Sequence, residues 1–496
     1  MINTTSNDEL VLAATCNTSS LAPYVPTNLN EWDVFKIQHI YRRLGYGASY
    51  EQIQNALSQS PQQLVNTLFE EALNASKRTP PEFTNWTISD YTYVDDDEFN
   101  EILRDQRTAY TQDRIDFLFT AGFRGRLTFF WLNHFVTQDG DYKFPSYMHE
   151  YYDALWDHAF GNFKTFVHNM GLVPAMLLFL NNFENTKTRP NENYARELFE
   201  LFTLGEDNGY TEEDILEASR AMTGYNQREE KGGPISFDPE KFDTGSKTIF
   251  GQRGNFSYSD VIDVLFEQKA PLIAQFICDK LYRFFVSPEI NTEIINEMAV
   301  TFQNNNFEIE PVLRQLLSSQ HFFDASAQGV VIKSPYDFTH QFFNETGFAT
   351  NELIIERIKT YNDILGQRMF SPIDVAGWQR DRDWLNSSTL PARWLIIEDL
   401  LSILNEEDPE QFRKFAVAVS NNSTDVREVT KAIVNHFIAK ELHTEVDYEV
   451  AIDIFKWENP ENYYTEGIWN LQFESVPVQV RILLGHIGQI PEFQLK

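Results

Sequence analysis

Apolar residues recur at three- and four-residue spacing along most of the chain, starting in the segment NLNEWDVFKIQHIYRRLGYGAS. This spacing places the apolar side chains on one face of an α-helix, so the pattern predicts helices. The predicted stretches are residues 50 to 75, 100 to 137, 146 to 180, 191 to 204, 211 to 223, 259 to 286, 291 to 304, 310 to 323, 334 to 345 and 391 to 440. We therefore expect a mainly α protein with a large multi-helical domain.

Two parts of the chain break this pattern. Residues 1–30 are rich in Asn, Ser, Thr and Pro and show no periodicity, which is typical of a flexible lead-in. Residues 225–260 combine glycines, prolines and the short β-like pieces PISF and KTIFG, and indicate an irregular β-containing excursion. We expect three parts: the lead-in, a helical domain at 31–395 and a C-terminal helical subdomain at 396–496.

The charge balance removes several classes of function. The 496 residues include 40 Lys and Arg against 73 Asp and Glu, a formal net charge of −33, and no run of Lys or Arg is longer than two. Such a chain repels nucleic acid and anionic lipid, so we expect no nucleic-acid partner. With 42% hydrophobic residues it is too apolar for a disordered tail. No run of about 18 apolar residues occurs, which predicts a soluble protein without a transmembrane segment.

Cysteine usage and the N-terminus bear on the compartment. Only Cys16 and Cys278 occur, which excludes a disulfide scaffold and a cysteine-based zinc site. Cys278 lies in an apolar run and is predicted to be a core residue. The start MINTTSNDELVLAATC lacks the positive and long apolar regions of a secretory signal, yet VLAATC resembles the zone around a processing site. Both an exported mature form and a cytoplasmic protein fit these residues.

The most informative segment is RPNENYARELFELFTLG, residues 189 to 205. Pro190 predicts a helix start and Gly205 a helix stop. One face of this helix collects a polar stripe of Glu192, Asn193, Arg196, Glu197 and Glu200. The stripe is either a solvated face with Glu–Arg pairs at i,i+4 spacing, or a buried acidic cluster that holds a hard cation or shares a proton.

The following helix adds a second charged stripe. Thr211 and Asp214 have the spacing of a capping box, and Glu213, Glu217 and Arg220 share one face. If the stripes of the two helices face each other, they form an ionic network between antiparallel helices.

Two upstream segments contain histidines with alternative interpretations. The segment RLTFFWLNHFVTQ is apolar nearly all round and predicts a buried helix, on which His134 is either a hydrogen-bonded core residue or a ligand. In HEYYDALWDH, His149, Asp153 and Asp157 have a spacing that suits metal ligation but also a solvated face. Nucleophile-elbow, phosphate-loop, dinucleotide-binding and zinc-protease motifs are absent from the sequence, which disfavours the common hydrolase, kinase and dehydrogenase classes.

The segments NENYARELFELFTLG and GYTEEDILEASRAMTGY resemble the signature of the bacterial family catalogued as domain of unknown function 1800. The resemblance continues in HIYRRLGYGAS, FFWLNHF, HAFGNFKTFV, PAMLLFLNN, KTIFG, APLIAQFICDKLYRFFV, IKSP, LGQRMFSPIDVAGW and WLNSSTLPARW, and covers about residues 35 to 395. It implies an essentially all-helical protein, usually made with an export signal and often encoded beside a sulfatase- or phosphatase-like partner. The motif positions that it implies are His134, Glu192, Asn193, Arg196, Glu197, Glu200, Glu217 and Arg220.

The chain departs from the family pattern at three positions. Leu132 stands where the family tends to have a second histidine, Asn181 replaces an expected aspartate, and Phe242 replaces the histidine of a His-Asp pair that retains Asp243. The expected side chains would be natural metal ligands or acid/base groups. A divalent metal is therefore one candidate cofactor, but no strong motif in the sequence supports it.

Two functions fit these observations. The first is an exported hydrolase, secreted or periplasmic, that acts on an extracellular polymer such as a polysaccharide. Glu197, Glu200 and His134 would serve as acid/base groups or metal ligands, and Arg196 would orient them or bind an anion. Substrate-binding candidates are Glu192, Asn193, Glu217, Arg220 and Trp378, and Trp378 and Trp384 either stack on sugar rings or pack the C-terminal loop. The alternative is a non-catalytic helical binding or assembly protein for a secreted or surface partner.

Overall fold

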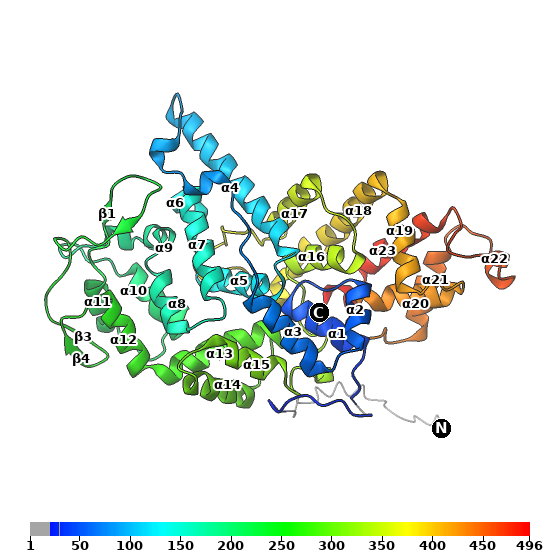
Figure 1. Ribbon diagram of the computed structural model, residues 1–496, viewed down its shortest axis with the longest axis horizontal. Helices are drawn as coiled ribbons and strands as arrows, with labels where there is room; N and C mark the ends of the chain where they lie inside the picture. Colours follow the sequence, from blue (N-terminus) through cyan, green and yellow to red (C-terminus); the bar gives the residue numbers. More distant parts are fainter. Residues whose placement is uncertain (1–19, 29) are drawn as a thin grey trace, which may run out of the picture.

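The computed structural model describes residues 20–28 and 30–496, which fold almost entirely into α-helices (Figure 1). Helices α1 to α8 are Val34–Leu44, Tyr50–Leu57, Pro61–Leu73, Asp96–Leu118, Gly122–His134, Asp139–Tyr142, Pro145–His158 and Phe163–Met170. Helices α9 to α15 are Pro174–Phe179, Asn193–Glu197, Glu212–Ala221, Tyr258–Gln268, Ala270–Phe285, Thr292–Asn304 and Ile309–Leu317. Helices α16 to α23 are Pro335–Thr346, Glu352–Ile364, Thr389–Glu407, Glu410–Val419, Val426–Phe437, Glu445–Lys456, Glu461–Thr465 and Val476–Gln489. The mainly α prediction is confirmed.

Several long predicted helices are interrupted, and glycine or proline lies at the breaks. Pro61 separates α2 from α3, and Pro409 lies between α18 and α19. The stretch predicted as one helical pattern at 146 to 180 becomes α7, α8 and α9, with Gly161 at the first break and Pro174 at the second. Proline lacks an N–H and suits a first helical turn, so Pro61 and Pro174 each begin a new helix, and Pro409 directly precedes one.

The predicted excursion consists of two small hairpins at the edge of the molecule, of which the second lies beside α11 and α12 (Figure 1). Strand β1 (Gln227–Arg228) pairs antiparallel with β2 (Ile235–Ser236), and β3 (Lys247–Ile249) pairs antiparallel with β4 (Gln252–Gly254). The β3–β4 turn is made by Phe250 and Gly251, whose φ angles are 49° and 77°. Two positive φ angles match the twist of a tight hairpin, so the excursion at 225–260 is confirmed.

Helix α16 begins at a capping box that also prepares a charged site. Ser334 accepts a hydrogen bond from the N–H of Asp337 at 3.2 Å, and the Asp337 carboxylate accepts one from the N–H of Ser334 at 3.0 Å. Pro335 occupies the first turn. The Asp337 side chain is therefore fixed by local sequence before any distant contact is made.

The C-terminal helices pack mainly around α23, which contacts α18, α19 and α21. After α23 the chain returns to the middle of the molecule, where the C-terminus lies in Figure 1. Leu495 forms an antiparallel bridge with Ile332, and the N–H of Lys333 donates to the carbonyl of Gln494 at 2.8 Å. This return brings Lys496 close to the start of α16.

Buried hydrophobic side chains form one continuous cluster that runs from Leu21 to Phe493. Cys278 is fully buried in it, which confirms the core prediction, while Cys16 lies outside the described residues. Among the described residues no helix is both long and apolar enough to cross a membrane.

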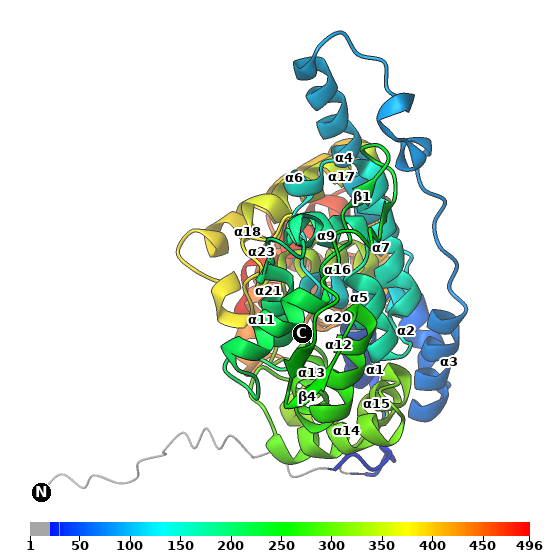
Figure 2. The ribbon, with the colours of Figure 1, turned by 90° about the vertical axis from the view of Figure 1, so that its left-hand side faces the viewer.

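Part of the predicted lead-in contacts the body of the protein. Residues 20–28 pass beneath α14 and α15 (Figure 2). Leu21 and Tyr24 are buried, and the N–H of Tyr24 donates to the carbonyl of Ser318 at 2.8 Å. The rest of the lead-in, residues 1–19, lies outside the described residues.

Candidate functional site

The first motif helix changes its winding half way. Helix α10 ends at Glu197, and the chain continues as a π-helix over Leu198–Thr203. There the N–H of Leu204 donates to the carbonyl of Phe199, five residues back instead of four. A stripe predicted from about 100° per residue therefore applies only up to Glu197.

The charges of this helix are paired with one another near solvent. Arg196 lies 3.3 Å from Glu192, 3.1 Å from Glu200 and 2.6 Å from Glu212 of α11. Glu212 is 76% exposed and Arg196 is 32% exposed. The hydrogen bond to Glu212 is the first cause of a raised Arg196 pKa. This arrangement matches the solvated-face alternative, and the Glu212 contact joins the two motif helices.

Glu197 stands apart from this ladder. It is half-buried, and burial followed by the negative charge of Glu200 raises its pKa above the ordinary value. Among the described residues no hydrogen bond or ion pair reaches its carboxylate, and Asn193 at the start of the helix is exposed. Glu197 therefore has the environment of a carboxyl group that holds a proton more readily than its neighbours.

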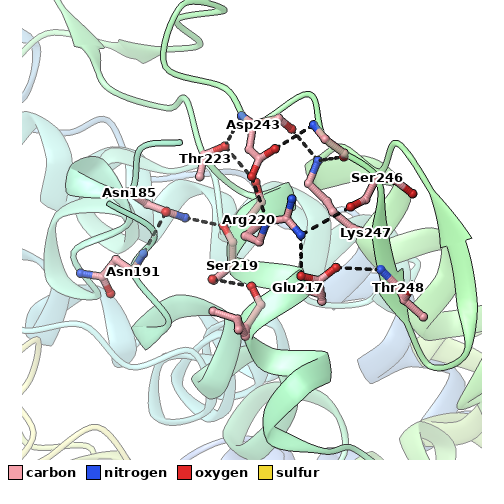
Figure 3. A network of polar contacts seen from close by, with 12 residues as sticks. Asn185, Asn191, Glu217, Ser219, Arg220, Thr223, Asp243, Ser246, Lys247 and Thr248 are labelled. Atoms are coloured by element: carbon pink, nitrogen blue, oxygen red, sulfur yellow. Dashed lines mark hydrogen bonds and ion pairs between the residues drawn. The ribbon is translucent and has the colours of Figure 1, made fainter. Parts of the chain in front are cut away.

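Glu217 and Arg220 of the second motif helix face the excursion instead of the first helix (Figure 3). Arg220 donates to Asp243 at 2.9 Å and to Glu217 at 2.5 Å. The second oxygen of Glu217 accepts from the N–H of Thr248 in β3 at 2.9 Å. The N–H of Asp243 in turn donates to Thr223 at 2.8 Å. Glu217 and Arg220 thus tie the β3–β4 hairpin to α11, and only Glu212 connects α11 with the Arg196 ladder.

A second polar contact group connects the π-helix with α5 and α13. The carbonyls of Leu201 and Phe202 lie in the last turn of the π-helix, where helices run short of backbone donors. Lys280 of α13 donates to Leu201 at 3.0 Å, and Nε2 of His134 of α5 lies 3.1 Å from the Phe202 oxygen. Lys280 Nζ and His134 Nδ1 are 3.1 Å apart. His134 is 4% exposed, so the prediction of a buried helix at this position is confirmed.

Both basic groups are shifted towards their neutral forms. Burial, and then the nearby charge of Arg380, lower the pKa of Lys280 to about 7. Burial and the charge of Lys280 lower the pKa of His134 well below its ordinary value. At neutral pH the imidazole is therefore uncharged, and part of the lysine population is the neutral amine.

His134 and Lys280 line a cavity of about 430 Å³ between α5, α13, the start of α16 and the loop that precedes α18. Aromatic side chains form much of its wall: Phe129, Phe130, Phe284, Trp378 and Trp384. Trp378 stacks on Phe129 with ring centroids 5.0 Å apart, its backbone N–H donates to Asn133 Oδ1 at 2.7 Å, and its indole N–H donates to the Arg368 carbonyl at 2.9 Å. Trp378 thus packs the loop against α5 and also lines the cavity.

The ionisable residues of the cavity wall are mostly basic. The basic ones are Arg126, Lys280, Arg283, Arg380 and Lys496, and the acidic ones are Glu289, Asp337 and Asp381. Asp337 lies 2.8 Å from Arg126 and 2.6 Å from Lys496, and all three are almost completely buried. Burial alone would raise the Asp337 pKa, but Arg126 and Lys496 outweigh it and hold that pKa well below its usual range.

The model of a family described as Protein of unknown function (DUF1800) matches residues 39–495. The chain belongs to the DUF1800 family. The match extends past the 35 to 395 stretch that carried the resemblance and includes the C-terminal helices. No curated protein and no solved structure matches the chain significantly.

The structure divides the candidate residues of this DUF1800 protein into three groups. His134 and Trp378 line the cavity. Glu192, Arg196, Glu197 and Glu200 lie on the first motif helix, where Arg196 joins Glu192 and Glu200, and Glu217 and Arg220 anchor the hairpin. None of these last six is among the lining residues of the cavity, and neither is Asn193.

The three departures from the DUF1800 pattern have structural roles. Leu132 is buried in α5. Asn181 adopts the left-handed conformation, with a φ of 56°, before a short 3₁₀ turn. The Phe242 ring lies 4.9 Å from the Lys247 nitrogen, so an aromatic contact replaces the expected histidine beside Asp243.

The structure assigns other partners to the predicted metal-spaced residues. Lys77 lies 2.8 Å from Asp153 and 2.8 Å from Asp157, and His149 contacts Tyr110 and Asp153. A lysine thus lies between the two carboxylates. Within residues 20–28 and 30–496 no three His, Cys, Asp or Glu side chains are grouped closely enough to hold a metal ion.

Sequence reasoning missed Lys280, Arg380 and Asp337. One signal for Lys280 was present, because it is a lone lysine in the apolar segment LIAQFICDKLYRFF. Asp337 had the local signal of its capping box with Ser334, but its partners Arg126 and Lys496 come from segments far away in sequence. Arg380 had no local signal, since it gains its role only from distant segments.

Proposed function

We propose that this protein binds an anionic ligand in the aromatic and basic cavity, and that this ligand is one end or side group of an acidic polysaccharide. The observation that carries the proposal is a reversal of charge. The whole chain has 73 acidic and 40 basic residues, whereas five basic and three acidic residues line the cavity. Basic groups concentrated against the net charge of a protein favour an anion at that point.

The other lining groups support a saccharide as the ligand class. Trp378 and Trp384 supply flat apolar surface, and Asn133 and Gln367 supply amide groups that can hydrogen-bond hydroxyls. Arg380 and Arg283 supply guanidinium groups, which bind carboxylate and sulfate oxygens with two parallel hydrogen bonds. Together they form a mainly aromatic pocket with a few oriented polar groups, which is the usual composition of a small-ligand site.

The setting of this function follows from the family resemblance. We place the protein outside the cytoplasm, secreted or periplasmic, where acidic polysaccharides occur. A sulfatase- or phosphatase-like protein is the partner that we expect, because such a partner would modify the anionic groups that the cavity binds.

Hydrolysis of the polymer is the second candidate, and one observation favours it. Glu197 is half-buried beside Glu200 and its pKa is raised, which is the condition of a general acid. The two carboxylates do not line the cavity, so this chemistry would take place at a separate surface. If Glu197→Gln and Glu200→Gln abolish the release of reducing ends from an acidic polysaccharide without lowering the melting temperature, the hydrolase is supported. If neither the unchanged protein nor the variants release reducing ends, it fails.

Titration calorimetry tests the binding function with three probes: inorganic sulfate, a sulfated oligosaccharide and the same oligosaccharide after desulfation. We expect the sulfated probe to bind and the neutral one to bind at least about tenfold more weakly, because one charge-assisted hydrogen bond contributes roughly 1.5 to 3 kcal/mol. Arg380→Gln should weaken the sulfated probe by about tenfold.

The matched control is Arg427→Gln, which removes an arginine paired with Glu449 at the surface of the C-terminal helices. This variant should bind the sulfated probe as the unchanged protein does. Equal affinity for the sulfated and neutral probes would overturn the anion site, as would equal losses in the Arg380 and Arg427 variants.

A further inference from the structure

The Lys280 nitrogen has two fixed partners and no carboxylate. Nζ lies 3.0 Å from the Leu201 oxygen and 3.1 Å from His134 Nδ1. Asp279, the adjacent residue, is paired with Arg283 at 2.8 Å. In the described part of the chain no Asp or Glu lies within ion-pair distance of Nζ. A lysine in a mostly buried position usually needs such a partner to keep its charge.

The hydrogens between these groups can be assigned from the acceptors. The Phe202 carbonyl can only accept, so the His134 Nε2 that lies 3.1 Å from it must bear the hydrogen. In a neutral imidazole the other nitrogen, Nδ1, then has a lone pair and no hydrogen. His134 Nδ1 therefore accepts from Lys280, and the Leu201 carbonyl does the same.

Both acceptors together match a neutral amine. A neutral amine has two N–H bonds and one lone pair, and the two acceptors use both N–H bonds. The lone pair is then the one unengaged position of a nitrogen that lies in the cavity wall. An ammonium group would instead have a third N–H, for which the described residues offer only the Phe276 ring at 4.5 Å.

We propose that Lys280 forms an imine with an anionic aldehyde or ketone, such as a 2-oxo acid or the open-chain reducing end of an acidic sugar. The inference rests on the proposed anion site, because Arg380 holds the carboxylate of the ligand while Lys280 attacks its carbonyl carbon. The apolar wall of Phe130 and Phe284 limits the water that would hydrolyse the product.

The step balances without an oxidant or reductant. The Nζ lone pair forms a C–N bond with the carbonyl carbon while the C=O π bond breaks towards oxygen. His134 Nδ1, already in contact with Nζ, takes the first N–H proton and passes it to that oxygen, which gives a carbinolamine. The second N–H proton follows the same path to the hydroxyl, which leaves as water while the C=N bond forms. One amine and one carbonyl give one imine and one water.

Reductive trapping tests the inference on the full chain. The protein is incubated with glyoxylate and sodium cyanoborohydride, and the modified residue is located by peptide mass spectrometry. Reduction of the imine leaves a carboxymethyl group on Nζ. We expect one adduct per chain, at Lys280, formed at least about tenfold faster than at any other lysine, because Lys496, a second cavity lysine whose pKa burial lowers, is held by the Asp337 carboxylate. The rate should rise between pH 6 and pH 8, and acetaldehyde, which lacks the carboxylate, should react about tenfold more slowly.

The outcomes separate this inference from the proposed function. Sulfate binding without a preferred Lys280 adduct overturns the imine and leaves the anion site in place. Absence of both overturns both. Adducts spread evenly over exposed lysines such as Lys414 also overturn the imine. This readout uses the unchanged protein, so it does not require that a variant folds. Lys280→Met should abolish the adduct, whereas Lys414→Met should leave it unchanged.

Discussion

The motif helices and the cavity treat charge in opposite ways. On the motif helices Arg196 meets three carboxylates, and Arg220 meets two. In the cavity wall basic groups outnumber acidic ones, and Lys280 has no carboxylate partner in the described structure. Where charges are matched, they hold elements together, and where they are unmatched, a ligand can complete them. The densest sequence motif is therefore not the place where the structure leaves charge available.

The largest effect on stability is expected at Asp337, the buried carboxylate that pairs with two basic groups of the cavity wall. Asp337→Asn would leave Arg126 and Lys496 buried without a carboxylate, which costs roughly 3 to 5 kcal/mol of the free energy of unfolding. Urea denaturation measures this loss. Glu449→Gln at an exposed pair is the control and should leave the free energy of unfolding nearly unchanged. A loss below about 1 kcal/mol for Asp337→Asn would show that the basic groups of the cavity need no matching carboxylate.

A smaller loss is expected at the hairpin anchor. Glu217→Gln removes the charge that binds both Arg220 and the N–H of Thr248, and should lower the free energy of unfolding by roughly 2 kcal/mol. Hydrogen exchange should show faster exchange at Thr248 and the rest of β3–β4 than in α13. Unchanged protection of the hairpin would contradict the architectural role of the second motif helix.

The pH dependence of anion binding tests whether Lys280 contributes its charge to the cavity. The Lys280 pKa is lowered to about 7, and a bound anion favours the ammonium form, so the affinity for sulfate should fall as the pH rises from 6 to 8. The fall should approach tenfold and be lost in Lys280→Met. The effect on unfolding has the opposite sign, since between about pH 7 and 10.5 the unfolded chain binds the additional proton and stability rises with pH. An affinity that rises with pH would contradict an ammonium as the anion partner.

The smallest effect is expected in the exposed ladder. Arg196→Gln removes contacts to Glu192, Glu200 and Glu212 near solvent and should cost at most about 1 kcal/mol, with a smaller cost at high salt. Urea denaturation at low and high ionic strength measures both. A cost near that of Asp337→Asn would show that the ladder is more than a solvated face.

The helices could be predicted from the sequence because each buries one face, which leaves a local apolar period of three and four residues. The cavity could not be predicted in this way. Its wall combines Arg126, Lys280, Asp337 and Arg380 from four distant segments, and helical periodicity does not determine which segments meet. In the local sequence, Lys280 looks like an ordinary polar residue of an amphipathic helix. The i,i+4 pairs of Arg196 were predictable because both partners lie on one helix, while the contact to Glu212 depends on how α10 and α11 meet.

Because of the π-helix, the family motif depends on the number of residues in this turn as well as on their identity. Leu198–Thr203 contains one residue more per turn than an α-helix would use, and this surplus presents the Leu201 and Phe202 carbonyls to Lys280 and His134. A relative that has every motif side chain but one residue fewer in this turn would align almost perfectly with this chain. Its helix would be rotated by about 100° beyond the gap, and the cavity would lose the backbone that orients its two basic groups. Chain length across this turn is thus as informative about function as residue identity.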